Sequence, residues 1–213
     1  MDIFKKLKNN KGTISSALGK ELAQKALGGK EEILHEAIRL ASYEPGNIEA
    51  KNIRTGAAKI VEFVAKKKPI FVATHLDKLL KALDMPEPQT RWIIIRAFGF
   101  CAHLNPKRAV KAIDYARNFL DSDEGVCLTG AASLYLGDLG SVSPAYAKLA
   151  LPILNEFIKK ASVNEVDWVL EAYIKIYDNI IQADQQKIKT FASKHKKAPK
   201  QSTRKRVEKI LKK

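Results

Sequence analysis

The sequence has few of the residues that build most catalytic and metal centres. Its 213 residues include two cysteines, Cys101 and Cys127, which lie too far apart for a zinc or redox spacing. Both stand in apolar, helix-like stretches, so we expect them to be buried, reduced thiols. The four histidines lie at least 28 residues apart, at His35, His75, His103 and His195. Their spacing gives no i, i+4 metal pair, and we expect no metal ion, no cofactor and no catalytic residue.

Glycine-rich loops and long apolar runs are also missing. There is no Gly-x-Gly-x-x-Gly or Walker loop, and the doubled glycine Gly28-Gly29 is explained as a helix stop. No apolar run approaches the roughly 18 residues that cross a bilayer, and the charged N-terminus lacks the apolar core of a signal peptide. Hairpin signals of the Asn-Gly or Asp-Gly type are absent. We therefore expect a cytoplasmic protein without β-structure.

Acidic residues are scarce at the two ends of the chain. The formal net charge is +15, and residues 187–213 hold twelve Lys and Arg against one acidic residue, Glu208. Residues 1–11 hold four Lys against Asp2, whereas residues 12–186 are nearly neutral. The basic character therefore belongs to the ends, mainly the C-terminal one, and the body offers no uniformly basic groove.

Helical periodicity fills most of the sequence. Apolar residues recur with the 3.6-residue period in the segments 13–27, 31–43, 48–66, 70–83, 89–103, 107–120, 126–139, 145–160, 165–181, 184–195 and 201–212. Pro69, Pro106 and Pro144 each suit the first turn of a helix, where a missing N–H costs nothing. Pro152 falls inside a segment, so we expect it to bend or interrupt that helix.

Four small residues mark an internal repeat. Ala58, Ala97, Ala132 and Ala172 stand in similar apolar surroundings, at spacings of 39, 35 and 40 residues. A proline follows each of the first three by 9 to 12 residues and opens a second helix. A period near 40 residues, with two helices and a small residue where they cross, is typical of α-solenoids.

The repeat resembles the HEAT family. The stretch 121–140, which contains Thr-Gly-Ala-Ala-Ser-Leu, is most similar to its pattern, and Arg54 and Arg91 match the position where that family carries an arginine. The resemblance covers about 50–180. It implies an all-α fold, a right-handed α-α superhelix (a HEAT/armadillo-like solenoid) of about five helix pairs with a C-terminal capping helix. We expect a single domain, 1–213, made of a basic N-terminal segment 1–12, helical repeats 13–195 and a basic cap helix 196–213.

The C-terminal end is the first candidate binding site. Its dozen positive charges would bind phosphates in a salt-sensitive way. Phe191 is the single aromatic residue there, so base stacking is not indicated. The candidate residues for nucleic acid or another polyanion are Lys196, Lys197, Lys200, Arg204, Lys205 and Arg206.

The same segment also has the pattern of a solubilising cap helix, and the two interpretations are compatible. Val207, Ile210 and Leu211 form an apolar stripe that would turn inward. The residues that would then turn outward are Arg204, Lys205, Lys209 and Lys212.

A second basic patch begins the segment 107–120. Lys107, Arg108 and Lys111 are further candidate polyanion contacts, whereas the turn lysines at 66–68 are typical of a solvated rim. Arg96 stands inside the most apolar helix. It is either paired with an acidic group, because an unpaired buried charge is costly, or available to bind an anion.

These observations leave three hypotheses for the function. The first is a non-enzymatic HEAT-repeat scaffold that binds a protein partner and whose basic end contacts nucleic acid or another polyanion without binding a membrane. The second rests on Asp167-Trp168-x-x-Glu171, which is distantly similar to a segment of the HEAT-like alkylpurine DNA glycosylases. Those enzymes use tryptophans and a carboxylate on a concave basic surface, and this chain lacks their paired tryptophans. The third is an accessory repeat protein without a nucleic-acid role.

Overall fold

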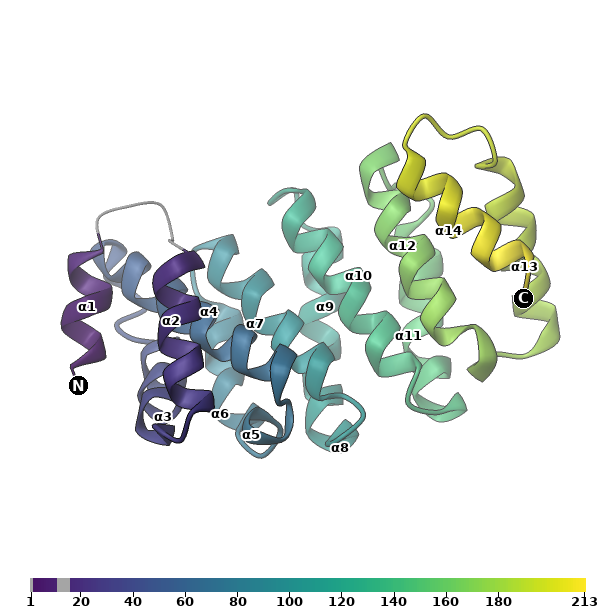
Figure 1. The fold of residues 1–213 in the computed structure, drawn as a ribbon. Helices are drawn as coiled ribbons and strands as arrows, with labels where there is room; N and C mark the ends of the chain where they lie inside the picture. The colour runs from purple at the N-terminus through teal and green to yellow at the C-terminus, as the bar shows by residue number, and fades with distance from the viewer. Residues whose placement is uncertain (1, 11–15) are drawn as a thin grey trace. The chain divides into compact units, whose positions relative to one another are not determined.

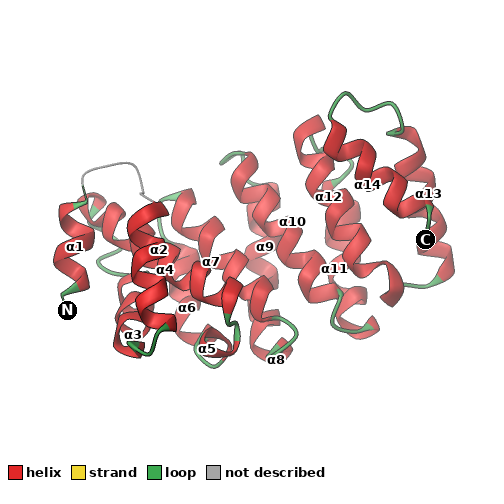
Figure 2. Cartoon of the chain, viewed as in Figure 1, coloured by secondary structure: helices red, strands yellow, loops and turns green. Residues whose placement is uncertain are grey.

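The structure, a computed structural model, describes residues 2–10 and 16–213 (Figure 1). Every regular element in these ranges is a helix and none is a strand, which confirms the predicted all-α class (Figure 2). The first residues of the predicted segment 13–27 and the end of the basic segment 1–12 lie outside the described residues. No helix in the described ranges has the length and apolar character needed to cross a membrane.

The chain divides into two compact units, residues 1–112 and 113–213. In the first unit α4 lies between α2 and α7, while α1 and α3 pack against α4. The described helices of this unit are α1 (Ile3–Asn9), α2 (Ser16–Leu27), α3 (Glu31–Leu40), α4 (Lys51–Lys67), α5 (Ile70–Ala73), α6 (Leu76–Leu79), α7 (Pro88–Cys101) and α8 (Pro106–Ala109), with 3-10 turns at Ile48–Ala50, Leu80–Asp84 and Val110–Ala112.

The second unit repeats this arrangement. Here α12 lies between α10 and α14, α9 and α11 pack against α10, and α13 packs against α14. Its helices are α9 (Ile113–Asp121), α10 (Val126–Gly140), α11 (Pro144–Phe157), α12 (Val163–Ile176), α13 (Gln182–Lys194) and α14 (Gln201–Leu211), with a 3-10 turn at Tyr177–Asn179. Each unit thus contains a row of three helices side by side, covered by the helices that connect them in sequence.

Contacts within each unit join residues about one predicted period apart. In the first unit Asn105 Nδ2 donates to the Ala73 carbonyl, 32 residues away, at 3.2 Å. In the second, Thr129 Oγ1 donates to Glu165 over a separation of 36 residues, and Asn179 Nδ2 donates to the Ser141 carbonyl over 38. Equivalent turns of successive helix pairs are therefore neighbours in space.

Small residues allow the helices of each row to approach closely. A Cβ added at Gly137 on α10 would lie 2.7 Å from the Cα of Ala172 on α12. A Cβ at Gly56 on α4 would lie 2.6 Å from a methyl group of Leu7 on α1. The four alanines of the repeat register, Ala58, Ala97, Ala132 and Ala172, are all fully buried.

The segment 70–83 is not the single helix that its apolar stripe predicts. It divides at Thr74 and His75 into α5, α6 and a 3-10 turn. The break frees backbone carbonyls, which need new donors. Asn105 supplies one to Ala73 and Arg108 supplies one to Thr74. Polar side chains one period further along thus stabilise the break.

Three other expectations need correction. The segment 1–12 was expected only to be basic, but it contains α1, whose Ile3 and Leu7 are buried. Cys101 is buried as expected, whereas Cys127 is exposed in the first turn of α10, whose buried residues begin at Leu128. The interruption expected at Pro152 does not occur, because α11 is continuous from Pro144 to Phe157. Pro152 is exposed, so water can reach the carbonyl that its ring leaves without a partner.

A buried ion pair organises the first unit. Arg54 on α4 is fully buried, and its Nε and Nη2 donate to the two oxygens of Glu87 at 2.8 Å each. Its Nη1 donates to the carbonyls of Tyr43, Glu44 and Asn47, which fixes the turn before α4. Burial alone would raise the pKa of Glu87, but its hydrogen bonds from Arg54 and Thr90 outweigh this and lower it. The pair is therefore ionised and satisfied.

We expect Gly137→Ala to destabilise the protein by about 1–3 kcal/mol, because the new methyl group would press on the backbone of α12. Gly46→Ala is the control, since a Cβ there meets nothing within 4 Å. Urea denaturation at neutral pH measures both variants. Equal stability of the two would contradict the close approach of α10 and α12.

We expect Glu87→Ala to cost about 3–5 kcal/mol, because it leaves the Arg54 guanidinium buried without its counter-ion. The matched variant Glu36→Ala removes the acidic partner of Arg39 in an exposed pair and should cost less than about 1 kcal/mol. Thermal and urea unfolding compare the two. A small loss for Glu87→Ala would mean that water reaches Arg54.

Candidate functional site

Helix α14 carries most of the predicted polyanion site. Its apolar stripe is confirmed in part, because Val207 and Ile210 are buried and Leu211 is half-buried. The helix packs on α12 and α13 (Figure 1). Because this apolar stripe has only three residues, polar contacts must contribute much of the attachment of α14 to α12.

These polar contacts converge on the carboxylate of Asp167 in α12. Its side chain is only 3% exposed. The Oδ1 atom accepts from Arg206 Nη1 at 2.7 Å and from Thr203 Oγ1 at 3.1 Å. The Oδ2 atom accepts from Ser202 Oγ at 3.2 Å and lies 3.0 Å from Lys200 Nζ. Two predicted polyanion contacts, Lys200 and Arg206, therefore bind an acidic group inside the protein.

The charge of Asp167 is maintained by these donors. Burial by itself would raise the pKa of the carboxyl group. The hydrogen bond from Lys200, the charge of Arg206 and the hydrogen bond from Thr203 outweigh burial and hold the pKa below its ordinary value. Asp167 is thus an ionised carboxylate with both oxygens engaged, which weighs against a role as a catalytic base.

Other acidic groups of α12 and its following turn are matched in the same way. Arg206 Nε donates to Glu171 at 2.8 Å, and Lys213 Nζ donates to Asp178 at 2.6 Å. The basic residues near α12 therefore compensate its acids. They do not form a continuous cationic surface.

Arg204 does not turn outward as the cap-helix interpretation expects. It is half-buried, and its Nη1 donates to the carbonyls of Ala198 and Pro199 at 2.7 Å each. These carbonyls belong to the turn between α13 and α14. The guanidinium can reach them because Arg204 stands in the first turn of α14, next to that segment.

The remaining candidates at this end are exposed. Lys196 and Lys197 lie in the turn after α13, and Lys205 lies on the outer side of α14. None of them forms an ion pair with another described residue of the protein. Two further lysines on α14 and at its end, Lys209 and Lys212, are exposed as expected. Together with Lys194, the exposed last residue of α13, these five side chains are cationic groups that the fold leaves available to solvent.

The second predicted patch lies in the first unit. Lys111 Nζ is 2.9 Å from Asp77, and Arg108 Nε is 3.1 Å from the same carboxylate. Lys107 is exposed. Sequence reasoning did not foresee the pairing because Asp77 is 34 residues from Lys111.

A row of cations and aromatic rings on α2, α4 and α7 was also missed. The Lys59 ammonium lies 4.4 Å from the centre of the Trp92 ring, and the Arg96 guanidinium lies 4.6 Å from that of Phe100. Trp92, Arg96 and Phe100 follow one another at i, i+4 and i+8, a spacing that places them on one helix face. This spacing is the sequence signal from which the row could have been predicted. Lys59 also pairs with Glu62 at 2.8 Å, so its charge is already compensated within the protein.

In the second unit, Trp168 also lies close to cationic side chains. A Cβ at Gly130 would lie 2.8 Å from the indole, so the ring packs directly on the α10 backbone. Lys200 Nζ and Arg206 Cζ each lie 5.9 Å from the ring centre. The tryptophan of the glycosylase-like segment is therefore in contact with the structure that attaches α14.

Two histidines come together despite their distance in sequence. The rings of His35 and His75 are 5.3 Å apart in an edge-to-face arrangement. Burial, followed by the charge of Lys78, lowers the pKa of His75. Even so, among the residues that the structure describes, no three His, Cys, Asp or Glu side chains are grouped so as to hold a metal ion.

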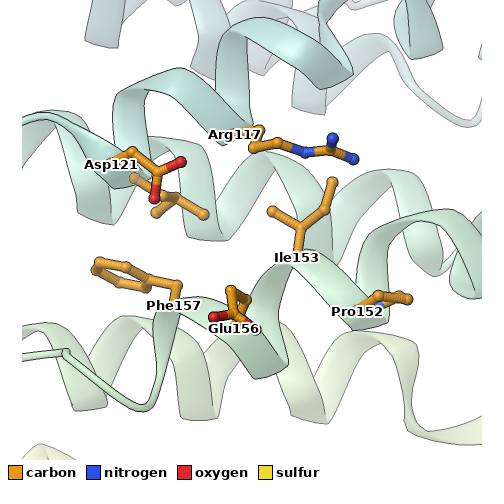
Figure 3. A pocket seen from close by; sticks show the side chains of 7 residues that line it. Arg117, Asp121, Pro152, Ile153, Glu156 and Phe157 are labelled. Atoms are coloured by element: carbon orange, nitrogen blue, oxygen red, sulfur yellow. The ribbon is translucent and has the colours of Figure 1, made fainter.

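The second unit also contains a pocket of about 300 Å³ between α9 and α11 (Figure 3). Arg117 and Asp121 lie on one side, and Ile153, Glu156 and Phe157 lie on the other. Asp121 pairs with Lys160 at 2.6 Å, and Glu156 pairs with a neighbouring lysine. The lining is mostly apolar and its acidic groups are already paired, so it assembles no acid–base pair.

No protein-family model matches this chain, and no match is found among the curated proteins. Its function must therefore be inferred from its own residues.

We expect Asp167→Asn to destabilise the protein at pH 7, with a loss that shrinks as the pH falls below about 4. The folded pKa of Asp167 is depressed, so its ionic contribution is complete above the unfolded pKa and is lost as pH falls through the folded one. Urea unfolding of both proteins at pH 7 and pH 3 measures the difference. A loss that does not depend on pH would mean that the charge of Asp167 does not attach α14.

Proposed function

We propose that the protein is a non-enzymatic, HEAT-like repeat protein that binds the phosphate backbone of nucleic acid through the exposed lysines at its C-terminal end. The repeat assignment is supported by the contacts between residues 32 to 38 positions apart and by the buried small residues between neighbouring helices. A stack of helix pairs of this kind offers extended surface for a protein partner as well.

The separation of paired from exposed cations is the observation that carries the proposal. Lys200, Arg206 and Lys213 neutralise the acids of α12 and its following turn. The exposed cations that pair with no acid lie at the end of α13, on the turn after it and on the outer side of α14, at Lys194, Lys196, Lys197, Lys205, Lys209 and Lys212. In this region Glu208 is the one exposed acidic residue among those described. Such a surface attracts a polyanion over a Debye length of about 10 Å.

The chemistry favours backbone contacts over the reading of bases. Lysine ammonium groups neutralise phosphates, whereas sequence is read by side chains that reach base edges. Phe191, the aromatic residue of this end, is half-buried and packed against Tyr173 and His195. It therefore offers no stacking platform. Binding should be salt-sensitive and nearly independent of sequence.

The glycosylase-like alternative would need a carboxylate that can act on a bound nucleotide. Asp167 accepts hydrogen bonds on both oxygens, and Glu171 accepts one from Arg206. Trp168 rests on Gly130 beside the same cations. This arrangement favours a structural role for the segment 167–171.

We expect replacement of Lys196, Lys197, Lys205 and Lys209 by Gln to remove most of the affinity for a duplex of about 20 base pairs. Each lysine that contacts a phosphate contributes about 0.9 to the slope of log K against log salt, so the slope should fall by up to about 3–4. Fluorescence anisotropy over a salt series measures both quantities. The melting temperature should stay nearly unchanged because all four side chains are exposed.

The matched control replaces four exposed lysines of the first unit, Lys66, Lys67, Lys68 and Lys81, by Gln. It removes the same net charge but should leave most of the affinity in place. Equal losses in the two variants would point to a general charge effect and overturn the assignment of the site. Binding that survives the C-terminal variant but fails in a folded Trp168→Ala protein would favour the glycosylase-like alternative.

A further inference from the structure

The segment 195–200, here called the lysine turn, joins α13 to α14. The backbone N–H of His195, Lys196 and Ala198 each donate to a carbonyl three residues earlier in the chain. Lys196 and Lys197 are exposed, whereas Ala198 is half-buried. The turn is thus folded back on itself, with its lysines toward solvent.

The end of the lysine turn is fixed from α14. Arg204 Nη1 donates to the carbonyls of Ala198 and Pro199, both at 2.7 Å. Lys200 Nζ lies 3.0 Å from Asp167, which ties the last residue of the turn to α12. Without Arg204, the two carbonyls would lose a charged donor, and within residues 197–199 only the backbone hydrogen bond from Ala198 to His195 would remain.

We infer that Arg204 is a positioning residue of the polyanion site, which holds the lysine turn so that Lys196 and Lys197 are presented together. This inference rests on the proposed function. The sequence predicts a direct phosphate contact for Arg204, but a guanidinium nitrogen that already donates to two carbonyls is directed into the protein. Its contribution to binding is to order the turn before the ligand arrives.

The physical basis is preorganisation. A mobile turn must be ordered on binding, which costs conformational entropy for each side chain that becomes immobilised. Arginine suits this task because its guanidinium is planar, permanently charged and carries several donors in a fixed geometry. A turn ordered in advance avoids that cost, so affinity rises without any additional phosphate contact.

The test compares Arg204→Met with Lys205→Met, two neighbouring substitutions that each remove one positive charge. For Arg204→Met we expect affinity for a duplex of about 20 base pairs to fall about 3- to 10-fold, with the salt slope unchanged. For Lys205→Met we expect the slope to fall by about 1, because an exposed phosphate contact is lost. Fluorescence anisotropy over a salt series separates the two effects.

A second measurement follows the turn without nucleic acid. Trypsin should cut after Lys197 faster in Arg204→Met than in the original protein, and at the original rate in Lys205→Met. Cleavage after Lys160, in an exposed turn of the same unit, provides the internal reference for general unfolding. Faster cutting at both bonds would mean that the whole unit is loosened and would overturn the positioning role.

The outcomes distinguish this inference from the proposed function. If Arg204→Met lowers the salt slope and leaves the turn protected, Arg204 contacts phosphate directly, so the inference is wrong while the proposed function stands. If the original protein does not bind the duplex at all, both fail. An unchanged slope, weaker binding and faster cleavage confined to the lysine turn would support Arg204 as a positioning residue.

Discussion

The attachment of α14 depends on one buried carboxylate. Asp167 accepts from Ser202, Thr203 and Arg206 in the first two turns of α14 and pairs with Lys200, the last residue of the turn before it. Because a single acid organises Lys200, Thr203 and Arg206, the direction of α14 and the path of the turn before it are fixed together. Basic residues of this end that do not pair with Asp167 or another acid remain exposed to solvent.

Much of the fold could be predicted from the sequence. Helix limits such as 126–139 agree with α10 to within a residue, because a 3.6-residue apolar period is a local signal. The segment 70–83 was misjudged because its break is stabilised by Asn105 and Arg108, about 32 to 34 residues away. Helix α1 was missed because its apolar residues, Ile3 and Leu7, are diluted by lysines and gain their stability by packing on α4.

The candidate site was less predictable because charge counting ignores pairing. Local composition distinguished the basic end from the neutral body, and Lys196, Lys197 and Lys205 are indeed exposed. In the sequence, Lys200 and Arg206 are indistinguishable from these exposed residues. Their partner Asp167 lies 33 to 39 positions away, so the local sequence does not reveal the ion pairs. Only the packing of one helix pair on the next decides which cations are internal counter-ions. The same argument applies to Arg108 and Lys111, which share Asp77.

The two tryptophans give each compact unit its own optical reporter. Trp92 belongs to residues 1–112 and lies beneath Lys59, while Trp168 belongs to residues 113–213 and lies beside Lys200 and Arg206. A nearby cation shifts indole emission, so each signal depends on its local packing. Single-tryptophan proteins would therefore resolve whether the units unfold as one cooperative system or in sequence. The emission of Trp168 would also follow the detachment of α14 while the rest of its unit stays folded.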